Sequence, residues 1–359
     1  MEIKEIRDIY GGMPQCGALV KMLEDKTVKT VFLKGLLASS GPMFFSALAD
    51  RHADTMMFVL QDADEAGYFY HDLTQLMGTQ QVLFYPSSYR RAVKYGQRDA
   101  GSEILRTEVL SRLAQRGGNN GYDEKGNRKI GNEEARSKAE NAKAGSNKAS
   151  KALYIVTCPE ALSELVVSKQ RLDERTLSLA VSQTVDIVET EKTLREFGFA
   201  QVDYVYEPGQ FAVRGSILDV YSFSSELPFR IDFFGDEIDT IRTFNVEDQL
   251  SKDKKDAVEI VPELAKMTEE KMPLTSFLPA DTVVAVKDLA YVADTIARIY
   301  DEGFAQQAVA ERLEGATEEE QKEIMRSLSR ENQLVSGTRF KEGIAAFRRI
   351  DMGHKPLGT

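Results

Sequence analysis

The chain has 359 residues, of which 42% are hydrophobic and 29% are charged, a composition typical of a folded protein with two or three domains. Its net charge of −11, from 57 acidic and 46 basic side chains, disfavours non-specific DNA binding unless the basic residues cluster. Two cysteines exclude a disulfide framework, and without a long apolar run or a signal-peptide pattern we expect a cytoplasmic protein with no membrane partner.

The first part of the chain alternates between short apolar strands and amphipathic helices. This pattern is typical of a parallel sheet in an α/β layer. The expected strands cover residues 30–33, 55–60 and 81–85, and the expected helices cover residues 17–23, 43–49, 65–76 and 102–115.

Residues 117–150 have a different character. They are rich in Gly and Asn, and Tyr122 and Ile130 are their only bulky apolar residues. Such a segment buries too little surface to offset the entropy of ordering, so we predict a disordered insertion, with an interdomain linker as the alternative. A strand over 152–157 and a helix over 158–167 resume the earlier pattern, which favours an insertion within one domain.

From about residue 177 the sequence becomes rich in strands, and it returns to a mixed α/β pattern after Pro262. We therefore expect three parts, with residues 1–175, 176–263 and 264–359. The expected strands cover residues 185–188, 201–205, 211–221, 229–234, 238–244 and 282–286, with helices over 190–197 and from 288 to about 330.

A phosphate-binding loop is the first candidate site, in the turn after the first strand. Such a loop needs two glycines at a fixed spacing, followed by Lys and Ser or Thr. Here Gly35 and Gly41 are one residue too far apart, and Pro42 and Met43 replace the lysine and the hydroxyl residue. Without these groups the β- and γ-phosphates and Mg²⁺ lack their ligands, so we predict a degenerate loop with no bound cofactor.

A β-hairpin over residues 229–244 is the second candidate. Side chains alternate between the two faces of a strand, so Arg230 and Phe234 point away from Phe229, Ile231 and Phe233. The same alternation in the preceding strand sets Arg214 on the face opposite Val213, and Gly215 predicts a bulge or bend there.

Arg214, Arg230 and Phe234 can therefore share one outer face. Arginine and aromatic side chains are typical anchors of protein interfaces, because the guanidinium group can bind carboxylates through two hydrogen bonds. The alternative is that Arg230 pairs with Asp232, Asp239 or Glu237 and that Phe234 packs under a loop.

No residue pattern predicts catalysis or a metal site in this chain. The three histidines lie far apart, and no Ser or Cys lies in a known nucleophile signature. The acidic residues Asp232, Asp236, Glu237 and Asp239 suit a solvated strand edge better than a metal site, because adjacent strand positions diverge.

At this hairpin the sequence resembles a known family. The run from Gly209 to Asp219, Glu226-Leu227-Pro228 and the block from Arg230 to Ile238 are similar to a signature of bacterial transcription-repair coupling factors (Mfd) and the excision-repair protein UvrB. UvrB keeps an intact phosphate loop, whereas the amino-terminal module of coupling factors has a degraded one. The chain therefore resembles the UvrB-like module of the coupling factors.

The resemblance implies a fold and a set of partners. It implies a degenerate P-loop-type (RecA-like) parallel-sheet domain, a β-rich α+β domain and a smaller α/β domain packed on the first. It also implies a non-catalytic platform that binds UvrA through Arg214, Arg230 and Phe234. In the full-length family members, other domains bind RNA polymerase, DNA, ATP and Mg²⁺, and a carboxy-terminal domain masks the UvrA-binding face.

Two other functions remain as alternatives at this stage. One is a UvrB-like ATP-dependent helicase fragment with a divergent nucleotide loop, which predicts binding of ATP. The other is a direct binder of damaged DNA, which predicts an affinity that falls steeply with salt and which the acidic net charge disfavours.

Overall fold

The computed structural model describes residues 3–88, 100–117, 152–264, 271–303, 317, 319, 321–322 and 329–353. The chain divides into two compact units, one of residues 1–109, 149–166 and 270–359, the other of residues 110–148 and 167–269. The predicted insertion lies outside the described residues from position 118 onward. None of the helices among the described residues is both long enough and apolar enough to cross a membrane.

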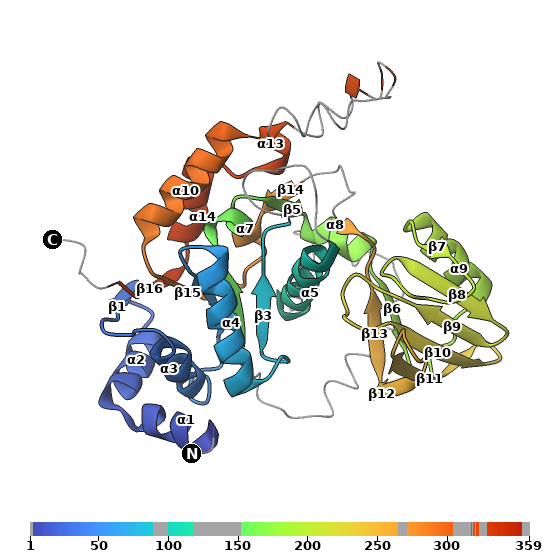
Figure 1. The fold of residues 1–359 in the computed structure, drawn as a ribbon, viewed down its shortest axis with the longest axis horizontal. Coiled ribbons are helices and arrows are strands. Elements are labelled where there is room, and N and C mark those ends of the chain that lie inside the picture. Colours follow the sequence, from blue (N-terminus) through green and yellow to red (C-terminus); the bar gives the residue numbers. More distant parts are fainter. Residues whose placement is uncertain are drawn as a thin grey trace. The chain divides into compact units, whose positions relative to one another are not determined.

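A six-stranded sheet forms the centre of the first unit (Figure 1). All neighbouring strands are parallel, in the order β1-β16-β15-β2-β4-β3, which confirms the predicted parallel α/β layer. The central strands β2, β4 and β15 are buried along their whole length, as expected for a parallel sheet covered on both faces. The strands are β1 (Thr30–Phe32), β2 (Thr55–Val59), β3 (Val82–Tyr85), β4 (Leu153–Thr157), β15 (Val283–Val286) and β16 (Arg348–Asp351).

Helices cover both faces of this sheet. α3 contacts α1, α2 and α4, whereas α10 contacts α7 and α14. These contacts define two separate groups of helices, and the full burial of β2, β4 and β15 requires cover on both faces of the sheet. The helices are α1 (Ile3–Gly12), α2 (Pro14–Glu24), α3 (Ser40–Leu48), α4 (Ala63–Met77), α5 (Ala100–Gly117), α7 (Pro159–Leu162), α10 (Leu289–Glu302), α13 (Arg330–Gln333), α14 (Gly337–Ala345) and the 3₁₀ helix η3 (Leu274–Ser276).

The last part of the chain contributes to the same sheet. The sequence predicts a smaller α/β domain over 264–359, but β15 and β16 lie between β1 and β2 in the first sheet. Residues 270–359 accordingly belong to the first compact unit. A local sequence pattern gives strand positions, but it does not show which sheet receives each strand.

The second unit contains a mostly antiparallel sheet in the order β12-β11-β10-β9-β8-β7. Strands β8 to β12 form an antiparallel meander, and β7 is parallel to β8. The strands are β7 (Ala200–Gln201), β8 (Gln210–Arg214), β9 (Ile217–Val220), β10 (Phe229–Phe234), β11 (Glu237–Phe244) and β12 (Ser251–Lys255), and the unit also holds α8 (Lys169–Glu174), β6 (Leu177–Ala180), α9 (Ile187–Glu196) and β13 (Ala257–Ile260).

One face of this second sheet carries the hydrophobic core of the unit, and we call it the inner face. Phe211, Ile231 and Phe233 from the strands pack with Leu194 of α9 and Leu179 of β6 in a single buried cluster. The predicted alternation is confirmed along β10, whereas in β8 Ala212 of the opposite face is also buried, in a second small cluster with Val205 and Phe244. The opposite face, which carries Ala212, Arg214, Asp219, Arg230, Asp232 and Arg242, is the outer face.

The strand predicted over 201–205 is present only as β7, which ends at Gln201. Local predictions fail at three other positions. The helix predicted over 158–167 ends at Leu162, because Leu165–Val167 forms β5, which pairs with β14 (Lys271–Pro273). The strand predicted over 185–188 is wrong, because Asp186 caps α9, which begins at Ile187.

The third failure is the single strand predicted over 211–221, which is a hairpin of β8 and β9. Gly215 and Ser216 form a two-residue turn between the strands, and Gly215 has φ 62°. This positive φ is the conformation that favours glycine in such turns. The hairpin predicted over residues 229–244 is present, with its turn at Gly235 and Asp236, and Gly235 also has φ 62°.

Candidate functional site

The turn after β1 forms hydrogen bonds within itself. The Leu37 N–H donates to the Ser40 Oγ over 2.7 Å, and the Ser40 N–H donates to the Leu37 carbonyl over 3.0 Å. The Gly41 N–H donates to the Ala38 carbonyl over 3.4 Å. The first N–H groups of α3 are thus already bonded, whereas a phosphate-binding loop directs such groups at its ligand.

The two glycines of the predicted degenerate loop have different surroundings. Gly35 lies in the turn with φ 96°. Gly41 lies inside α3 and is buried, and a Cβ atom there would be 3.2 Å from the Phe69 ring. The sequence next to Gly41 supplies Pro42 in place of the lysine, so the turn lacks the cation that follows the second glycine of a phosphate-binding loop.

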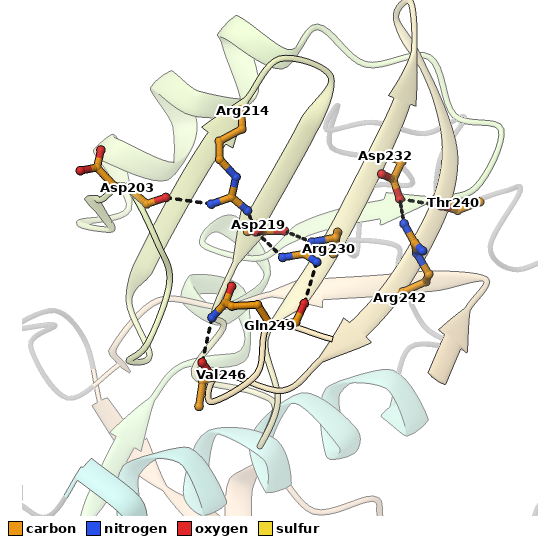
Figure 2. A network of polar contacts seen from close by, with 9 residues as sticks. All are labelled: Asp203, Arg214, Asp219, Arg230, Asp232, Thr240, Arg242, Val246 and Gln249. Atoms are coloured by element: carbon orange, nitrogen blue, oxygen red, sulfur yellow. Dashed lines mark hydrogen bonds and ion pairs between the residues drawn. The ribbon is translucent and has the colours of Figure 1, made fainter. Parts of the chain in front are cut away.

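The strand register brings Arg214 and Arg230, two of the three predicted site residues, onto the outer face (Figure 2). Asp219 of β9 pairs with Arg230 of β10 on one side and with Ala212 of β8 on the other. Arg214 lies two residues beyond Ala212 along β8, on the same face. The two arginines therefore reach the same aspartate from opposite sides.

Asp219 is the centre of this arrangement. The Arg230 Nε donates to Asp219 Oδ1 over 2.8 Å, and the Arg230 Nη2 donates to Oδ2 over 2.9 Å, which is a bidentate pair. The Arg214 Nη2 also donates to Oδ2. The Asp219 side chain is 0% exposed, against 15% for Arg230 and 36% for Arg214. Two guanidinium groups thus share one buried carboxylate, and the trio keeps one excess positive charge.

Backbone carbonyls and aromatic rings fix the two guanidinium groups further. The Arg230 Nη1 donates to the Gln249 carbonyl over 3.0 Å, and the Arg214 Nη1 donates to the Asp203 carbonyl over 2.8 Å. The Arg230 guanidinium carbon lies 4.5 Å from the centre of the Phe244 ring.

The Arg214 guanidinium carbon lies 5.0 Å from the centre of the Tyr204 ring. Cation–π contacts of this kind favour the charged form next to the aromatic face. The hydrogen bonds to Asp219 raise the pKa of Arg230 above its usual range, so Arg230 stays charged.

A second carboxylate on the outer face has its own partners. Asp232 accepts a hydrogen bond from Arg242, and it accepts another from the Thr240 hydroxyl over 2.8 Å (Figure 2). The alternative pairing of Arg230 with Asp232, Asp239 or Glu237 is therefore wrong, since Arg230 hydrogen-bonds to Asp219.

Phe234 lies at the end of β10 and is 85% exposed. The register between β10 and β11 shifts between Asp232 and Phe233, which marks a bulge or irregularity just before this residue. The extra residue, Asp239, belongs to β11, so the alternation of side chains along β10 continues to Phe234. The alternative in which Phe234 packs under a loop is wrong. The structure leaves a phenyl ring in solvent on the same face as the arginine pair.

This arrangement suits recognition rather than reaction. Across the described part of the chain, no group of three or more His, Cys, Asp or Glu side chains could hold a metal ion. The outer face offers an exposed aromatic ring, the half-exposed guanidinium of Arg214 and a rigid charge network beneath them. Such a combination provides apolar area and directed hydrogen-bond donors to a protein partner. The binding role of these residues stays a prediction.

The sequence pattern misses Asp219 as a member of the site. Asp219 is a single charged residue between Leu218 and Val220, and a charge in an apolar strand is the signal that could have identified it. The carbonyls of Asp203 and Gln249 carry no sequence signal, because any residue supplies a backbone oxygen.

Comparison with known proteins points to the same region. A model of the UvrB interaction domain matches residues 177–265, which include β6 to β13 and the outer face. The match covers both arginines, Asp219 and Phe234.

Three relatives share the name transcription-repair-coupling factor. The chain is 26% identical to that of Bacillus subtilis (strain 168) over 264 residues, 73% of this chain and 20% of the relative. It is 34% identical to that of Haemophilus influenzae over 110 residues, 31% and 10% of the two chains. The third, from Escherichia coli (strain K12), is 45% identical over 65 residues, 18% and 6% of the two chains.

These comparisons confirm the resemblance to the amino-terminal UvrB-like module of the coupling factors. The chain spans about a fifth or less of the length of the three relatives.

Proposed function

We propose that this chain is a non-catalytic, cytoplasmic recruitment module of transcription-repair coupling, and that it binds UvrA through the outer face of its second sheet. The observation that carries the proposal is the exposed Phe234 beside two arginines that converge on Asp219. The match to the UvrB interaction domain over 177–265 supports the role, as do the coupling-factor relatives.

The partners of the longer relatives extend this proposal. Recruitment of UvrA by this module would bring excision repair to lesions at which RNA polymerase has stalled. Contacts with RNA polymerase and DNA, and hydrolysis of ATP with Mg²⁺, would belong to other domains of the full-length protein. A carboxy-terminal domain would cover the outer face until UvrA binds.

The alternative is a UvrB-like ATP-dependent helicase fragment. The turn after β1 speaks against it, because its N–H groups are bonded within the turn and no lysine follows Gly41. No observation on the described residues favours this alternative over recruitment.

A calorimetric titration of the chain with purified UvrA tests the proposal. We expect saturable binding in the micromolar range or tighter, the range of specific protein interfaces of ordinary size. Absence of heat and of complex formation in a parallel gel-filtration run would contradict it.

A further inference from the structure

We propose that Asp219 is the positioning residue of the outer face, which holds the guanidinium groups of Arg214 and Arg230 in the geometry that the partner recognises. This inference rests on the proposed function and gives a role to a residue that the resemblance leaves without one, since the resemblance assigns binding only to Arg214, Arg230 and Phe234. It predicts that loss of the Asp219 charge weakens UvrA binding, although the buried Asp219 side chain would act on UvrA only through the two arginines.

Asp219 holds the side chains of both arginines through hydrogen bonds to its carboxylate. Both of its carboxylate oxygens accept hydrogen bonds from Arg230, at 2.8 and 2.9 Å, and one oxygen also accepts from Arg214. Its side chain is 0% exposed, so it acts on a partner only through the arginines. The Asn amide has one acceptor oxygen and no charge, so it cannot form the bidentate pair with Arg230, and its NH₂ group would face guanidinium donors.

The position of Asp219 in the sheet makes the support rigid. Asp219 lies between Ala212 of β8 and Arg230 of β10 in a cross-strand row that continues to Arg242 of β11. Long arginine side chains lose considerable rotamer freedom when they are ordered. A buried carboxylate that orders them before binding removes that cost from the association step.

The test uses the whole chain and two matched substitutions. Asp219→Asn keeps the shape of the side chain but removes its charge and one acceptor oxygen. Asp232→Asn is the control, because Asp232 lies on the same face and pairs with Arg242 and Thr240 rather than with Arg214 or Arg230. Circular dichroism checks that each variant is folded.

We expect Asp219→Asn to weaken UvrA binding about tenfold or more, as for a buried charge pair that loses one partner. Asp232→Asn should stay within about threefold of wild type, as is usual for a partly exposed pair. In a variant that lacks both guanidinium groups, Arg214→Ala with Arg230→Ala, addition of Asp219→Asn should cause no further loss. A merely structural role of Asp219 would instead lower affinity in that background as well.

The outcomes separate this inference from the proposed function. If wild type fails to bind UvrA, the proposed function falls, and the inference falls with it. If wild type binds and Asp219→Asn binds equally well, or if both Asn variants lose affinity equally, only the inference is overturned.

If Asp219→Asn does not fold, NMR of the arginine side chains in the wild-type chain tests the inference instead. A bidentate pair with Asp219 stops rotation of the Arg230 guanidinium and predicts a slowly exchanging Nε–H signal with separate Nη signals. Rapidly exchanging, averaged signals of a free guanidinium would overturn the inference.

Discussion

The turn after β1 and the outer face of the second sheet differ in what their polar groups contact. In the turn, the N–H groups of Leu37, Ser40 and Gly41 bond to oxygens of the turn itself. On the outer face, the polar groups also bond to one another, but they leave Phe234 and part of Arg214 exposed. The polar groups at a common nucleotide-site position can thus be used up by internal hydrogen bonds, while a strand face elsewhere leaves an aromatic ring and part of an arginine exposed.

Arg230→Ala gives the largest effect we expect. It leaves the buried Asp219 with Arg214 as its remaining charged partner, so the free energy of unfolding should fall by about 3 kcal/mol, at the low end of the range for a broken buried pair. UvrA affinity should fall by about 2 kcal/mol or more, as for an interface hot spot. Urea denaturation and calorimetric titration measure the two quantities.

Arg242→Ala is the matched control for that prediction. Its partner Asp232 is 22% exposed, so the loss of stability should be about 1 kcal/mol or less. An Arg230→Ala variant as stable as Arg242→Ala would show that the Asp219 network is no more than a surface ion pair.

Phe234→Ala should lower the affinity for UvrA but leave the stability of the chain almost unchanged. The ring is 85% exposed, so its removal should change the free energy of unfolding by less than about 0.5 kcal/mol. The affinity for UvrA should nevertheless fall by about 2 kcal/mol, because an anchor ring buries its area only in the complex. The same titration and denaturation experiments apply.

Val188→Ala controls for the loss of any exposed apolar side chain. Val188 is 68% exposed on α9, whose Leu194 packs against the inner face of the sheet. Equal losses of affinity in both variants would refute a specific role of the outer face.

The smallest effect we expect is that of added nucleotide on the stability of the chain. A site with a micromolar dissociation constant would stabilise the chain by about 4 kcal/mol at a ligand concentration a thousandfold higher. With the turn after β1 bonded internally, we expect millimolar Mg-ATP to leave the melting temperature unchanged. A clear upward shift, confirmed by equilibrium binding of labelled ATP, would favour the helicase alternative.

The sequence predicts those features that depend on neighbouring residues. Alternation along residues 229–234 gives the bounds of β10 and the face of each side chain, and the turn at Gly235 and Asp236 follows from local chemistry. This local information suffices to put Arg230 and Phe234 on one face.

Features that depend on pairing between distant parts of the chain cannot be predicted from local sequence. Leu165–Val167 is a strand because it pairs with β14, about a hundred residues later in the chain. The role of Asp219 depends on the register between β9 and β10, which places it beside Arg230. Likewise, the place of β15 and β16 in the first sheet follows from long-range pairing.

Photocrosslinking from position 234 tests the central claim most directly. A benzophenone side chain in place of Phe234 should form a covalent product with UvrA, whereas the same group in place of Val188 on α9 should form none. Equal crosslinking from both positions, or crosslinking from position 188 alone, would contradict docking of UvrA on the outer face.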